Sequence, residues 1–260
     1  MFQKSKGLFM DFQDALLTPD IYFDYLKDKG EFPPQEKRPK TVLFVNQKIA
    51  LQYILSQHVH HWGKSFLSKL AFIDKTNVAI CGGFGIGAPA LTVKLEEMIA
   101  WGVSQFVWLG TSTRLTSDVE LHNTVFAKTA FGIDGVTKYY SDPSQGVTIS
   151  REMESFFGAY SRKFGHLVKG VNVMSSDLFF GTSKRDVDVF LEGKADVLDM
   201  ESAAFYAICK KRDVHCLSIL VTSDCLVTPE WVPGFDSNAT ITELKKAVDL
   251  AFSFAQECSQ

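Results

Sequence analysis

The stretch Asn77-Val-Ala-Ile-Cys-Gly-Gly-Phe-Gly-Ile-Gly-Ala-Pro89 decides how this chain folds. Residues 77–81 predict a buried strand, and the glycines that follow predict a tight turn. A helical pattern then runs over about 90–101, and an apolar run at 105–109 predicts the next strand. Strand, glycine turn, helix and strand form a βαβ unit, which implies parallel strands with ligands at their carboxyl ends.

Similar strand and helix patterns occur before and after this stretch. We expect strands at 41–45, 170–174 and 215–221, and helices at 21–29, 48–57, 186–191 and from Thr240 to the carboxyl end. Short polar or glycine-rich turns are expected at 82–88, 110–113 and 222–224, where they could meet in one crevice. The sequence therefore predicts a single α/β domain over 41–260 around a mixed, twisted sheet, with a helix and connector at 1–40 packed on it.

The composition of the chain excludes several classes of protein and partner. The chain has 260 residues, 46% of them hydrophobic, and a net charge of −3, without a long basic run. It is thus expected to be globular, with no nucleic-acid partner, no signal peptide and no membrane segment. The five cysteines lack a Cys-x-x-Cys pair, which favours reduced thiols and a cytoplasmic location. His58, His60 and His61 lack a second ligand cluster, so no metal site is predicted.

Gly83-x-Gly85-x-x-Ala88 satisfies a degenerate dinucleotide-binding pattern. The next strand of such a unit should end in an acidic residue that binds the ribose hydroxyls. Here it ends in Leu109-Gly110-Thr111, so a nicotinamide enzyme is disfavoured.

A second informative stretch is Val197-Leu-Asp-Met-Glu-Ser-Ala-Ala-Phe-Tyr206. Asp199 is expected to cap a helix that ends in cations at 210–212, which suit the helix dipole. Glu201 then falls in the first turn. It could simply serve the dipole there, or it could be a functional carboxylate.

Taken together, these motifs resemble the nucleoside phosphorylase and nucleosidase superfamily, of the uridine phosphorylase and hexameric purine nucleoside phosphorylase type. The resemblance runs from about Val78 to Val227. It rests on Gly85-Ile-Gly-Ala-Pro89, Glu96-Glu97 with Gly102, Leu109-Gly-Thr-Ser, Ser175-Ser-Asp-Leu-Phe-Phe180, Met200-Glu201-Ser-Ala-Ala and Ser223-Asp224, in that order.

The resemblance implies cleavage of a nucleoside N-glycosidic bond. This reaction develops positive charge on the sugar and negative charge on the base. Glu201 would accept hydrogen bonds from the ribose hydroxyls, with Met200 packed on the sugar, and Asp224 would donate a proton at purine N7. Phe179 would pack on the base, and Gly87 and Thr111 would contact the substrate.

The sequence departs from the family pattern where phosphate should bind. The Gly-Asp-Pro-x-Arg turn after the first strand is replaced by Asn46-Gln47-Lys48, and Trp108 stands where an arginine is expected. Thr111 and, across a subunit interface, Lys64 are candidate phosphate contacts, and Lys48 or Arg114 could compensate for the lost arginines.

Three functions therefore stay open. Phosphorolysis of a purine nucleoside, with inorganic phosphate as co-substrate and no other cofactor, is the first expectation. Hydrolysis and nucleoside binding without catalysis are the alternatives, although the glutamate usual after the first strand of the nucleosidase branch is also missing. A homodimer or higher homo-oligomer is expected because family pockets are completed by a neighbouring subunit.

Overall fold

The structure is a computed structural model that describes residues 15–31, 35–65, 68–142, 145–227 and 230–260. Of Lys64, Ser65, Ser68 and Lys69 it describes the backbone. None of the helices in these ranges combines the length and the apolar character needed to cross a membrane.

A ten-stranded mixed sheet forms the centre of the described fold. Its strands are β1 (Thr41–Val45), β2 (His60–Ser65), β3 (Ser68–Ile73), β4 (Val78–Gly82), β5 (Gln105–Arg114), β6 (Thr124–Gly132), β7 (Val147–Thr148), β8 (Lys169–Ser175), β9 (Val197–Asp199) and β10 (His215–Cys225).

The βαβ prediction is confirmed. β1 lies between β4 and β5 and runs parallel to both, and β10 runs parallel to β5 on its other side. The buried strand of 41–45 pairs Leu43 with Ile80 on one side and with Val107 on the other. Because these strands are covered on both faces, they read as continuous apolar runs. Their carboxyl ends share one edge.

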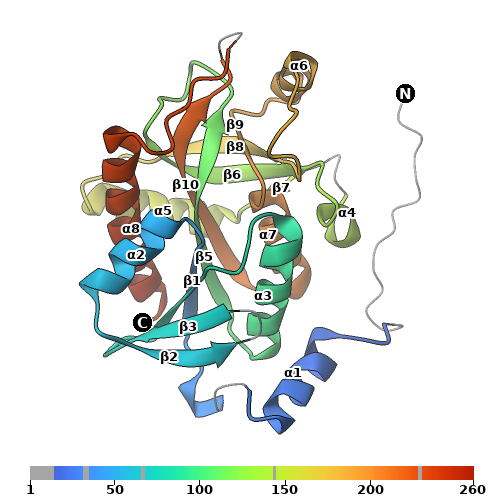
Figure 1. The fold of residues 1–260 in the computed structure, drawn as a ribbon, viewed down its shortest axis with the longest axis vertical. Helices are drawn as coiled ribbons and strands as arrows, with labels where there is room; N and C mark the ends of the chain where they lie inside the picture. The colour runs from blue at the N-terminus through green and yellow to red at the C-terminus, as the bar shows by residue number, and fades with distance from the viewer. Residues whose placement is uncertain (1–14, 32–34, 66–67, 143–144, 228–229) are drawn as a thin grey trace.

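Helices cover both faces of the sheet (Figure 1). They are α1 (Pro19–Asp28), α2 (Lys48–Gln57), α3 (Ala88–Ala100), α4 (Thr137–Tyr140), α5 (Arg151–Lys163), α6 (Lys184–Glu192), α7 (Ser202–Arg212) and α8 (Asn238–Cys258), with a short 3₁₀ helix at Gln35–Lys37. α8 packs with α2 and α5, whereas α7 packs with α3 and α4 (Figure 1). α1 contacts α3, and the division of the chain at residue 40 stays a prediction.

Two of the expected turns are wrong. β5 continues through Arg114 and β10 through Cys225, so 110–113 and 222–224 are strand residues rather than loops. Threonine and serine are compatible with strands, and here the two segments pair with each other and so keep their ladder. Their polar side chains therefore lie on a rigid sheet instead of on turns.

The start of α7 also differs from the expectation. The helix begins at Ser202, and Asp199 ends β9. Oδ2 of Asp199 nevertheless accepts from the Ser202 amide at 3.0 Å, so its side chain serves the first helical N–H. Glu201 occupies the N-cap position instead of the first turn, with an extended φ of −137°. This leaves its carboxyl group available for another contact.

Candidate functional site

A cavity of about 720 Å³ opens at the carboxyl ends of β1, β5 and β10. Its walls come from the start of α2, the end of β5, the loop after β8, the β9–α7 junction and the segment after β10. The expected crevice therefore exists. It is lined by two of the carboxylates singled out in the sequence, Glu201 and Asp224.

Glu201 lies at one wall and is tied to the glycine turn. Its Oε1 accepts from the Gly87 amide at 2.7 Å, and the residue is only 8% exposed. Gly87 has φ 92°, a conformation that glycine adopts without strain and that directs its N–H at the carboxyl group. The glycine turn and the Met-Glu stretch thus meet, as the sequence predicts.

The Glu201 carboxyl group has a raised pKa. Burial, and then the neighbouring Asp199 carboxyl, raise the pKa of Glu201 to about 8. Asp199 has more donors, since the Ser175 hydroxyl, the Ser202 amide and the Ser202 hydroxyl all bond to it. Burial raises the pKa of Asp199 as well, but its donors oppose that rise, so we assign the proton of this pair to Glu201 at neutral pH.

Asp224 also lines the cavity, is 3% exposed, and accepts hydrogen bonds from neutral donors among the described residues. The Thr113 hydroxyl contacts both carboxyl oxygens, at 3.1 Å and 3.0 Å. The Ser223 hydroxyl donates to Oδ1 at 3.0 Å and the Trp231 indole to Oδ2 at 2.8 Å. Burial raises the pKa of Asp224, and these donors oppose it. This direction is the one an acid at the base requires.

A β-bulge brings Asp224 to this position. Thr222 pairs with Ser112 and Asp224 with Thr113, so β10 advances two residues where β5 advances one. The bulge changes which face the following side chain uses. Asp224 consequently faces the Thr113 hydroxyl at the cavity.

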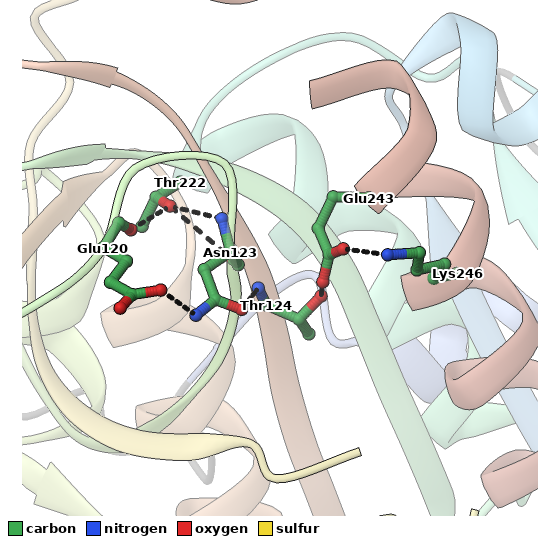
Figure 2. A network of polar contacts seen from close by, with 6 residues as sticks. All are labelled: Glu120, Asn123, Thr124, Thr222, Glu243 and Lys246. Carbon is green, nitrogen blue, oxygen red and sulfur yellow. Dashed lines mark hydrogen bonds and ion pairs between the residues drawn. The ribbon is translucent and has the colours of Figure 1, made fainter. Parts of the chain in front are cut away.

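The strand is fixed immediately before the bulge by a polar network (Figure 2). The buried Thr222 hydroxyl donates to the Glu120 carbonyl at 2.7 Å and accepts from the Asn123 amide at 3.0 Å. The network continues through Thr124 to Glu243 of α8, at 2.7 Å (Figure 2). The bulge therefore starts from a strand position anchored to a loop and, through it, to a helix.

The third wall, at the end of β1, lacks the expected arginines. Asn46 Oδ1 accepts from the Gly83 amide at 3.1 Å, and Gln47 Oε1 caps α2 at the Ala50 amide. The Trp108 side chain lines the cavity, is 2% exposed, and its indole N–H has no hydrogen-bond partner among the described residues. Lys48, at the start of α2, is the only cation among the described lining residues. The Arg114 guanidinium instead donates to the Thr116 carbonyl.

The structure places the other predicted site residues as follows. Met200, Thr111 and Phe179 line the cavity, and Phe179 is 57% exposed. Gly87 reaches the site through its bond to Glu201. Lys64 lies on β2, separated from β1 by β4 and β3, and its side chain is outside the described part, so its role stays a prediction.

Sequence reasoning missed Thr113 and Trp231. Thr113 directly follows the recognised Gly-Thr-Ser, and the correct length of β5 would have brought it to the cavity. Trp231 lies beyond the matched motifs, and it is identified by its contact with Asp224 and by its place in the cavity lining.

The chain is similar to known proteins in sequence. The sequence profile of the phosphorylase superfamily matches residues 44–257. A DeoD-type purine nucleoside phosphorylase of Clostridium novyi is 25% identical over 173 residues, covering 65% of this chain and 74% of the relative. A Bacillus cereus protein of the same name is 26% identical over 165 residues, covering 62% and 70% respectively.

Solved structures share the fold. A purine nucleoside phosphorylase from Toxoplasma gondii, in complex with immucillin-H, superposes with a TM-score of 0.75 at 14% identity, over 88% of this chain and 96% of that one. An AMP nucleosidase from Bacteroides thetaiotaomicron superposes with a TM-score of 0.73 at 13% identity, over 92% and 98%. Both phosphorylases and hydrolases thus have this architecture, and the profile match over most of the chain shows that the protein belongs to the phosphorylase superfamily.

Proposed function

We propose that the cavity cleaves the N-glycosidic bond of a purine nucleoside. The observation that carries this proposal is the pair of differently held carboxyl groups that line the same cavity. Glu201 is bound to the Gly87 N–H, and Asp224 is buried among hydroxyl and indole donors.

The two groups suit the two charges of the reaction. In this proposal Glu201 accepts hydrogen bonds from the ribose hydroxyls. These donors favour the ionised form of Glu201, so its negative charge develops beside the cationic sugar. Asp224 is to protonate the leaving base, for which its raised pKa is appropriate. Phe179, half exposed at the cavity, offers a ring for the base.

The cavity wall at the end of β1 suits water as the nucleophile better than phosphate. A phosphate dianion calls for several charge-assisted donors. Asn46 and Gln47 use their side-chain oxygens to hold the local backbone, and Trp108 offers a single neutral N–H. A water molecule needs only such neutral partners, so we propose a hydrolytic nucleosidase. The base leaves with the Asp224 proton, water bonds to the sugar carbon, and the proton that water loses returns to Asp224.

Phosphorolysis is the second candidate. It is favoured by Thr111 and Lys48, which line the same cavity, and by the relatives named purine nucleoside phosphorylase. Because this wall carries a lysine in place of the expected arginines, phosphate would bind weakly. We also keep the predicted homo-oligomer as a proposal, in which a second copy could supply further donors.

Product analysis tests the proposal. Purified protein is incubated with purine and pyrimidine nucleosides, each with and without inorganic phosphate. Free base and free sugar at equal rates in both conditions would support hydrolysis. Sugar 1-phosphate formed only with phosphate would establish phosphorolysis. Bound but unchanged nucleoside would refute catalysis and leave a nucleoside-binding protein.

A further inference from the structure

Both carboxyl oxygens of Asp224 have hydrogen-bond donors from the protein itself. Ser223 donates to Oδ1 and Trp231 Nε1 donates to Oδ2, while the single Thr113 hydroxyl hydrogen is shared between the two oxygens. An ionised carboxylate can accept all of these bonds, whereas a protonated oxygen must direct its own hydrogen at an acceptor. A base that accepts this proton has to reach one of the two carboxyl oxygens, which requires displacement of a donor that is now bound there.

Trp231 is the donor that can leave. Thr113 and Ser223 belong to β5 and β10, which are paired there, and Ser223 is fully buried. The Trp231 side chain is 53% exposed and follows β10. Its departure breaks one side-chain bond and leaves the sheet intact.

The backbone beside Trp231 is held, which confines the motion to the side chain. Val232 and Cys225 exchange two backbone hydrogen bonds, each of 3.0 Å. Gly234 packs so closely on β10 that an added Cβ would lie 2.4 Å from the Ser223 carbonyl oxygen. The indole can therefore rotate away while its own segment stays bound to the strand that carries Asp224.

We infer that the Trp231 indole is a gate on Asp224: it donates to Oδ2, and an incoming purine base displaces it. This inference rests on the proposed function and identifies Trp231 as a positioning residue. Phe235, whose ring lies 6.2 Å from that of Trp231, and Phe179 form the aromatic surroundings into which the base enters.

Gating also couples base binding to protonation. The charged groups nearby are Lys48, Asp199 and Glu201 on the cavity wall, Arg114 beside Thr113, and Glu230 beside Trp231. His122 lies behind Gly234 and bonds Thr240. Among the described residues, the direct bonds to Asp224 come from neutral donors. Removing the indole donor from a buried carboxylate raises its pKa, so displacement by a base favours the proton-donating form.

The test replaces Trp231→Phe, which keeps an aromatic ring and removes the N–H. If Asp224 must be protonated to act, kcat/KM falls as pH rises through its pKa. Loss of one donor should move this basic limb upward by roughly one pH unit, because a bond to a charged group has about that strength. The matched control is Trp62→Phe on β2, since Trp62 is 52% exposed. Its profile should equal that of the wild type.

A second measurement does not depend on turnover. Calorimetric titration with free adenine or hypoxanthine should show roughly threefold to tenfold tighter binding to Trp231→Phe, because the base no longer competes with the indole. Trp62→Phe should bind like the wild type. Unchanged affinity together with an unchanged pH limb would overturn the gate.

The two proposals fail in different ways. If the wild type cleaves no nucleoside, yet Trp231→Phe binds the bases more tightly than it, the gate stands and the proposed reaction falls. If the wild type cleaves nucleosides while Trp231→Phe leaves the limb and the affinity unchanged, the reaction stands and the gate falls. If no protein binds a base or cleaves a nucleoside, both are refuted.

Discussion

The Gly87 amide donates to Glu201 Oε1 at 2.7 Å, although 114 positions separate the two residues in the chain. This bond joins the turn after β4 to the N-cap position of α7. It orients the carboxyl group that is proposed to receive the ribose hydroxyls. Several consequences of the site geometry can be measured.

Gly87→Ala should impair the site more than the fold. The added Cβ would have 3.9 Å to its nearest neighbour, so the cost comes from φ 92°, about 1–3 kcal/mol. Gly165→Ala is the control, since Gly165 also has a positive φ, 86°, and nothing lies within 4 Å of its added Cβ. Both variants should lose stability in urea unfolding, but only Gly87→Ala should lower kcat/KM. Equal activities of the two variants would count against the role of this bond.

Glu201→Gln should change the pH dependence of stability. The pKa of Glu201 is about 8 in the folded protein against 4.5 for the unperturbed group, so between these values the unfolded chain is ionised and the native one is not. The free energy of unfolding of the wild type should therefore fall as pH rises from 4.5 to 8 and level off above, by about 1.4 kcal/mol per unit of pKa difference. Chemical denaturation at pH 5, 7 and 9 measures it.

The glutamine variant lacks this titration, so its stability relative to the wild type should rise over the same window. Glu152→Gln, at an exposed position of α5, is the control. A constant difference between Glu201→Gln and the wild type from pH 5 to pH 9 would contradict the assignment of a protonated Glu201.

Asp224→Asn should remove the proton donor while keeping the shape of the side chain. A general acid contributes about 10²- to 10⁴-fold to a rate, so kcat/KM should fall by that order. The basic limb of the pH profile should disappear with it. Circular dichroism and thermal melting verify that the variant is folded. Retention of the wild-type limb would assign the acid to another group.

Trp108→Arg should introduce phosphate dependence. Trp108 lines the cavity at the position where the family pattern has an arginine, and a guanidinium there would supply the missing charge-assisted donors. We expect sugar 1-phosphate among the products of this variant as phosphate is raised. Trp108→Phe keeps an apolar ring without the N–H and should give none. If both variants form the same products, this wall does not select the nucleophile.

Thr222→Val should weaken both the strand and the site. The fully buried hydroxyl bonds to the Glu120 carbonyl and the Asn123 amide, and an unpaired buried partner costs about 1–3 kcal/mol. Thr222→Ser keeps the hydroxyl and should lose less. Urea unfolding and kcat/KM should rank wild type, serine and valine in that order. Reversal of the last two would show that the methyl group matters more than the network.

The parallel core could be predicted from sequence because its signal is local. The apolar runs at 41–45 and 77–81 are strand-length and lie beside clear helical patterns, so β1, β4, α2 and α3 were expected within a few residues of their bounds. β2 and β3 were missed. They form an antiparallel pair at the sheet edge, where polar residues such as His60 and His61 hide the strand pattern.

The sequence predicts which residues gather at the cavity, but not how they are held there. Glu201, Asp224, Met200 and Thr111 follow from motifs, and the structure brings them to one cavity. Asp224 was expected on a turn, because Thr-Ser-Asp resembles one, whereas pairing with β5 keeps it in a strand. Contacts such as that of Trp231 with Asp224 arise from tertiary packing and produce no periodic pattern in the sequence.

The bulge between Thr222 and Asp224 has a consequence for engineering this protein. Because of the bulge, the direction of the Asp224 side chain does not depend on the register of the buried part of β10. The core of β10 and the position of the acid can therefore be redesigned independently. Core residues before Thr222 can be repacked without rotating Asp224, but deletion of the single extra residue would turn the carboxyl group toward the opposite face. A graft of this acid onto another sheet should therefore carry 222–224 as one unit.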